Sequence, residues 1–167
     1  MLKSTLNVSF VVKSKKTHAK GETFTQDNVG EEKERFLVSL DLISLKTRKD
    51  YDAFGRVGEF YFKIDGPKTF KARFPNKGVI KLQKNQTFTS KADLSLWSQF
   101  KTVKMGKEST EHLKVIIREM DHLKKDQTVA EQDLEINLPQ KTQYVIVQDA
   151  DENIKAKIRI QATRTRY

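Results

Sequence analysis

The sequence contains no cysteine, which excludes a disulfide, a thiolate nucleophile and a sulfur-ligated zinc or iron centre. Such a chain suits a reducing compartment, and we expect it in the cytoplasm. Long apolar runs are also missing, and without about eighteen consecutive apolar residues we expect no transmembrane segment. The opening stretch MLKSTLNVSFVVKSKK lacks the continuous apolar segment of a signal peptide, because Asn7 and Ser9 interrupt it. Any membrane contact is therefore expected to be peripheral.

Familiar catalytic motifs are absent as well. The three histidines, His18, His112 and His122, show none of the close pairing that a catalytic zinc site needs. The chain has no GxSxG, Walker or GxGxxG motif. Because a nucleophile with its base cannot be assembled from the sequence, we expect a protein that is not an enzyme.

Length and charge define the class of protein more closely. The 167 residues suit one domain with a sizeable core, and 37% hydrophobic with 32% charged residues indicate a folded, soluble chain. The net charge is +10, which raises the local concentration of a polyanion. Anionic phospholipid, an acidic protein and nucleic acid are the expected kinds of partner.

Alternation with a period of two is the dominant pattern. In NIKAKIRIQATRTRY, Ile158 and Ile160 fall on the side opposite Lys157 and Arg159, as in a half-buried antiparallel strand. VGEFYFKID and HLKVIIREM repeat this alternation. Further short segments rich in branched or aromatic residues predict strands: TLNVSFVV, RFLVSLDLISL, TFKARF, GVIKLQ, TFTSKADLSLWSQF, DLEINL and YVIV.

These strands predict an all-β fold, an antiparallel two-sheet sandwich of about eight strands forming one domain over residues 1–167. A long polar loop is expected at about residues 14–34. STEHLKVIIRE could also form an amphipathic helix, but its β-branched residues favour a strand. Trp97 is expected to anchor the core.

The order of segments in the second half resembles that of a C2 domain. LKVII leads into Glu119, Asp121 and Asp126, and is followed by QDLEINLP, YVIV and a closing strand after an acidic turn. The first half is similar, with RFLVSLDLISL, a loop carrying Asp50 and Asp52, and then GEFYFKI. The resemblance covers about residues 35–167.

The resemblance implies an eight-stranded sandwich that docks on phospholipid, in some members through calcium. The implied calcium ligands are Asp50 or Asp52, Glu59, Glu119, Asp121 and Asp126, which supply the hard oxygens that calcium needs. Nearby cations, Lys124 and Lys125 among them, would offset the field that a divalent ion feels. Binding without a cofactor is therefore our prediction, with calcium-dependent lipid binding as an alternative.

Basic segments offer a second means of docking. KTFKARFPNKGVIKLQK contains no acid, and the last strand carries cations on one face. Alternating lysine also keeps the outer face of an antiparallel sheet in water, so a purely solvating role is the competing interpretation. The predicted anion-binding residues are Lys68, Lys71, Arg73, Lys77, Lys81, Lys84, Lys155, Lys157 and Arg159.

We therefore predict a docking or scaffold module that binds anionic phospholipid or an acidic protein. The alternative is an assembly protein with a jelly-roll-type sandwich whose basic face lies against nucleic acid. RNA-binding sheets usually expose aromatics among their basic residues. Here only Tyr61 and Tyr167 are expected to be exposed, so phosphate contact is more plausible than base recognition.

Overall fold

The computed structural model describes residues 32–51, 57–67, 71–121 and 124–165, with the side chain of Asp93 excepted. By backbone contacts the chain divides into residues 1–30 and residues 31–167, and the described residues all belong to the second unit. The strand predicted at residues 5–12 and most of the predicted loop at 14–34 lie outside the described residues. The first described strand begins at Lys33, so strand structure starts before the predicted end of that loop.

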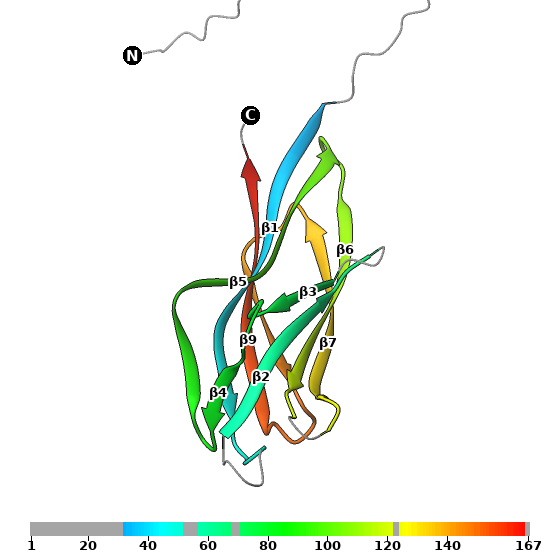
Figure 1. Ribbon diagram of the computed structural model, residues 1–167. Helices are drawn as coiled ribbons and strands as arrows, with labels where there is room; N and C mark the ends of the chain where they lie inside the picture. Colours follow the sequence, from blue (N-terminus) through cyan, green and yellow to red (C-terminus); the bar gives the residue numbers. More distant parts are fainter. Residues whose placement is uncertain (1–31, 52–56, 68–70, 122–123, 166–167) are drawn as a thin grey trace, which may run out of the picture. The chain divides into compact units, whose positions relative to one another are not determined.

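The described residues form nine strands, and no helix occurs among them (Figure 1). Residues 109–119, for which a helix was the alternative, form a strand, in accord with the β-branched Val115, Ile116 and Ile117. The strands are β1 Lys33–Thr47, β2 Val57–Asp65, β3 Lys71–Phe74, β4 Ile80–Gln83, β5 Thr87–Lys104, β6 Ser109–Glu119, β7 Gln127–Leu138, β8 Gln143–Gln148 and β9 Ile154–Thr165.

The strands build two antiparallel sheets. The first sheet, here called sheet A, has the order β5-β1-β9-β8. The second, sheet B, has the order β3-β2-β6-β7, and β4 also pairs with β2. Strands β7 and β8 are therefore edge strands of different sheets. The predicted two-sheet antiparallel sandwich is confirmed.

One hydrophobic core joins the two sheets. Alternation along each strand places one set of side chains inward, and fully buried residues come from sheet A, such as Leu40 and Ile158, and from sheet B, such as Phe62 and Ile117. Trp97 is also buried, as predicted. The side chains of the opposite set face away from the core and form the outer face of each sheet.

One of two register shifts in the pairing of β1 with β5 determines which later residues of β1 face outward. The shift between Leu40 and Asp41 skips a residue of β5 and leaves Leu40 and Leu42 both buried, whereas the shift between Leu42 and Ser44 skips Ile43 of β1 and also interrupts the pairing with β9. An extra residue at such a bulge resets the alternation of the strand. After the second shift Leu45 is buried, and Lys46 is exposed on the outer face of sheet A.

Candidate functional site

Four of the acids proposed as calcium ligands have partners within the protein, whereas Asp50 is exposed. A carboxylate oxygen of Glu59 lies 2.7 Å from Nζ of Lys81, and Glu119 is buried. An oxygen of Asp121 accepts a hydrogen bond from the backbone N–H of Lys124 at 3.1 Å. Asp52 lies outside the described residues. Across the described part of the chain, no three histidine or acidic side chains come together in a group that could hold a metal ion.

Asp126 connects the loop after β6 to sheet B. The Tyr61 hydroxyl donates to Oδ2 of Asp126 at 2.6 Å, and the backbone N–H of Asp121 lies 3.4 Å from the other oxygen. The Tyr61 hydrogen bond is the main cause of the lowered pKa of Asp126. The structure thus gives Asp126 a role in fixing the loop.

Tyr61 is 4% exposed, so the expectation that it lies open to solvent is wrong. The guanidinium of Arg73 covers its ring, 4.3 Å from the centroid. Burial is the main cause of the raised pKa of Tyr61, followed by the hydrogen bond to Asp126. A ring covered in this way cannot stack on a base. Tyr167, the other predicted exposed tyrosine, lies outside the described residues.

The cations of β3 and β4 lie at the edge of sheet B. Arg73 is held within the turn, because its guanidinium donates to the carbonyls of Pro75 and Gly78, and Lys81 pairs with Glu59. Lys71, Lys77 and Lys84 are exposed, as is Lys81 itself. Lys68 lies outside the described residues. Of the cations predicted here, Arg73 and Lys81 have internal partners that compete with an external phosphate.

The cations of β9 lie on the other sheet, on the outer face of sheet A. Arg159 is held by Asp41, with Nη2 3.1 Å from Oδ2 and the two side chains only 17% and 6% exposed. Lys157 is exposed, and its ammonium lies 4.6 Å from the centroid of the Tyr144 ring. Lys155 is half-buried. The basic residues of β3 and β4 and those of β9 therefore belong to different surfaces.

The pairing of β1 with β9 adds a third cation to Lys155 and Lys157. Lys46 of β1 stands directly opposite Lys155, and Ser44 stands opposite Lys157. On the neighbouring β8, Ile146 is opposite Lys157 and Tyr144 is opposite Arg159. Tyr144 is 56% exposed and Ile146 39% exposed. We call Lys46, Lys155, Lys157 and Tyr144 the cationic face, with Ile146 at its margin.

The cationic face is rich in hydroxyl groups and poor in carboxylates. Its register neighbours on β1 and β5 are Ser44, Thr87 and Thr89, which can all donate hydrogen bonds. Among the described residues that the pairing of β1, β8 and β9 assigns to this face, Asp41 is the one carboxylate, and it is held by Arg159. The positive charge of the three lysines therefore has no acid beside it within these strand pairs.

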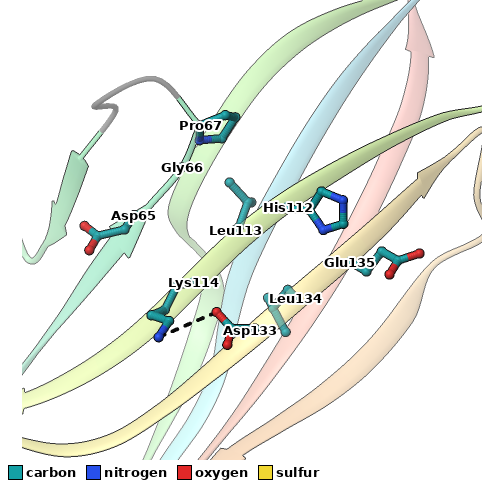
Figure 2. Close-up of a pocket in the computed structure, with 9 residues that line it drawn as sticks. All are labelled: Asp65, Gly66, Pro67, His112, Leu113, Lys114, Asp133, Leu134 and Glu135. Atoms are coloured by element: carbon teal, nitrogen blue, oxygen red, sulfur yellow. Dashed lines mark ion pairs between the residues drawn. The ribbon is translucent and has the colours of Figure 1, made fainter.

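A shallow hollow of about 510 Å³ lies on sheet B where β2 ends (Figure 2). His112 and Lys114 come from β6, Asp133 and Glu135 from β7, and Asp65 from β2. The ammonium of Lys114 lies 3.7 Å from Asp133 and 3.3 Å from Glu131. The hydrogen bond to Glu131 is the main cause of the raised pKa of Lys114. The charged side chains that line the hollow on sheet B are therefore mainly acidic, whereas the cationic face on sheet A carries lysines.

No protein-family model and no curated protein sequence matches the chain. Solved structures with a similar backbone include a C2 domain of plant extended synaptotagmin 1, with a TM-score of 0.48 and 10% identity over 79% of this chain and 97% of that chain. A structure described as a C2 domain has a TM-score of 0.44 and 9% identity over 77% of this chain and 98% of that chain.

A third similar structure is human GIVD cytosolic phospholipase A2, with a TM-score of 0.49 and 9% identity over 80% of this chain and 18% of that chain. The match therefore covers less than a fifth of the phospholipase chain. At such low identities these likenesses concern the arrangement of the strands. They agree with the C2 resemblance seen in the sequence.

Three residues of the cationic face and its margin were not predicted as binding residues from the sequence: Lys46, Tyr144 and Ile146. Lys46 follows an apolar strand and joins the other lysines only through the register of β1 with β9. YVIV was predicted as a strand, and the structure adds that β8 is an edge strand that exposes alternate residues. The alternation of Tyr144 and Ile146 with Val145 and Val147 was the signal in the sequence that could have predicted this exposure.

Among the described residues no helix has the length and apolarity required to cross a membrane.

Proposed function

We propose that this chain is a non-catalytic docking module that binds anionic phospholipid through the cationic face, without calcium. One observation carries the proposal: Lys46 and Lys155 stand directly opposite each other, with Lys157 on the same face. Like charges opposite each other destabilise a sheet. A phosphate-bearing surface would relieve this repulsion.

The composition of the face suits a membrane better than the other polyanions. Each lysine near an anionic bilayer contributes about 1 kcal/mol, so three lysines would give weak, reversible, salt-sensitive attachment. Tyrosine is favoured at the membrane-water interface, where its ring and its hydroxyl meet different media. Ile146 adds exposed aliphatic surface at the margin. Because Lys157 lies against the Tyr144 ring, that ring is less suited to stacking on a base.

Sedimentation with vesicles tests the proposal. The full chain should pellet with phosphatidylcholine vesicles containing phosphatidylserine and remain in solution with phosphatidylcholine alone. The triple variant Lys46→Gln, Lys155→Gln, Lys157→Gln should lose this binding. Calcium and a chelator should give the same result, because none of the interactions proposed here involves a metal ion.

A matched control removes the same charge from another surface. The variant Lys71→Gln, Lys77→Gln, Lys84→Gln neutralises three exposed lysines of the β3–β4 region and leaves Lys81, which pairs with Glu59, in place, and binding should be largely kept. Equal loss in both variants would show that diffuse charge, and not the cationic face, is responsible. Tighter binding to a single-stranded polynucleotide than to the vesicles, lost in the first variant, would identify nucleic acid as the partner and refute the lipid proposal.

A further inference from the structure

Strand β7 has one edge that pairs with no other strand among the described residues, and the proposed function does not use this edge. β7 ends sheet B, and the strand pairing of the described residues gives it β6 on one side and no strand on the other. An edge strand presents backbone N–H and C=O groups that another strand can pair with. At this edge Nε2 of Gln132 donates to the carbonyl of Asp133 at 3.0 Å. The carbonyl of Asp133 is thus an acceptor that now bonds a side chain of β7 itself, and an added strand could bond it instead.

A groove of about 360 Å³ lies between this edge and β8, the edge strand of sheet A. Leu134 of β7, Val145 of β8 and Ile160 of β9 line it together with Gln132 and Gln143, and the three apolar residues belong to the core or pack against it. Side chains of an added strand that point inward would therefore meet both apolar groups and side-chain amides. Ile146 also lines the groove, so the groove borders the cationic face.

The outer face of the same edge is acidic. Glu131, Asp133 and Glu135 alternate along β7 and are all exposed. Lys114 is shared between Glu131 and Asp133, as Figure 2 shows for Asp133, and the register partner of Glu135 is His112. Three carboxylates thus face one lysine and one histidine. This stretch is locally negative in a chain whose net charge is +10.

We propose that β7 binds an extended segment of a partner protein as an additional strand, and that this segment alternates apolar and basic residues. Its backbone would pair with the free edge of β7. Its apolar side chains would enter the groove beside Leu134, and its lysines or arginines would lie beside Glu131, Asp133 and Glu135. Backbone pairing gives affinity in this binding mode, and the alternate side chains give specificity. The proposal does not depend on lipid binding by the cationic face.

Fluorescence anisotropy with the full chain and a capped, labelled peptide of alternating isoleucine and lysine tests this inference. The peptide should bind saturably, and the variant Glu131→Gln, Asp133→Asn, Glu135→Gln should bind it about tenfold more weakly. A matched control is Asp50→Asn, Glu108→Gln, Asp151→Asn, which removes three exposed acids from loops elsewhere. This control should bind as the unaltered chain does.

Two further peptides separate the parts of the proposal. A peptide with N-methyl groups on alternate backbone nitrogens cannot pair along β7, and should not bind. A peptide of alternating isoleucine and glutamate should bind far more weakly than the lysine peptide. Equal binding of the N-methylated peptide would refute strand addition. Equal binding of the glutamate peptide, or equal loss in both triple variants, would refute recognition by the acids of β7, and absence of saturable binding would refute the proposal as a whole.

Discussion

Asp126 shows how a single carboxylate can fix a loop. It is the last residue of the loop between β6 and β7, and its Oδ2 accepts the short hydrogen bond from the hydroxyl of Tyr61 on β2. Arg118 of β6 also donates to the backbone carbonyl of Asp126. Contacts from two strands of sheet B thus hold the residue just before β7 begins. The acidic strand β7 therefore starts from a defined position.

Replacing Tyr61 by phenylalanine should destabilise the protein by about 1–2 kcal/mol at neutral pH, because a hydrogen bond to a charged group is lost. The folded state lowers the pKa of Asp126, so the stability it contributes is present above the unfolded pKa of about 4 and is lost as the pH falls through the folded value. The difference between the variant and the parent should therefore shrink below about pH 4. Urea unfolding at several pH values measures it.

The exposed Tyr144 offers a control for the Tyr61 variant. Tyr144→Phe removes a hydroxyl from a ring that is largely in solvent, and stability should change by less than about 0.5 kcal/mol. If Tyr61→Phe were equally harmless at neutral pH, Asp126 would not depend on Tyr61. If its effect persisted unchanged at pH 2, the loss would come from packing and not from the carboxylate.

At the scale of strands, the alternation of apolar and polar residues made most of the β-strands predictable from the sequence. VGEFYFKID coincides with β2, and the predicted last strand contains β9. Their large apolar side chains at every second position, such as Phe60 and Phe62, mark the face that packs into the core. The sandwich follows from several such strands.

The register of the strand pairs, which decides which side chains stand opposite each other, could not be predicted from the sequence. Lys46 and Lys155 meet only because β1 pairs with β9 at that offset, and the pairing of β2 with β4 brings Lys81 opposite Glu59. Arg73 alternates like a solvent-facing cation, yet its contacts with two carbonyls and the Tyr61 ring come from a turn and a neighbouring strand. Candidate sites built from residue type alone therefore included cations that have internal partners.

The opposed lysines lead to a prediction at this scale. Lys155→Gln removes one of two like charges that face each other across β1 and β9, so the free energy of unfolding should rise by about 0.3 kcal/mol. The same change should weaken attachment to anionic vesicles by about 1 kcal/mol. Thermal unfolding and vesicle titration measure the two effects. A loss of stability together with unchanged vesicle binding would mean that the cross-strand repulsion is negligible and that Lys155 does not meet the membrane.

For the whole molecule, the predicted cations divide between the two sheets. Lys71 stands opposite Asp65, which in turn stands opposite Lys114 on the outer face of sheet B, whereas Lys155 and Lys157 lie on the outer face of sheet A. The outer faces of a sandwich point in opposite directions. A flat anionic surface could thus meet only one of the two groups at a time.

The net charge of +10 should make stability depend on salt. Raising the ionic strength from about 0.01 M to about 0.15 M shortens the screening length from about 30 Å to about 8 Å. Self-repulsion then falls, and the melting temperature should rise by about 2 °C or more. Binding to anionic vesicles should weaken over the same range. A fall in the melting temperature would show that the ion pairs of the fold outweigh its overall repulsion.

The acids of β7 also determine what happens when two molecules of this protein meet in solution. Exposed edge strands are the usual route to fibres, because each can extend the sheet of another molecule. If two β7 edges paired antiparallel, Glu131, Asp133 and Glu135 of each molecule would be brought against the same three carboxylates of the other. The charge pattern thereby protects a strand of twelve residues from polymerisation, while leaving it able to pair with a segment of opposite charge.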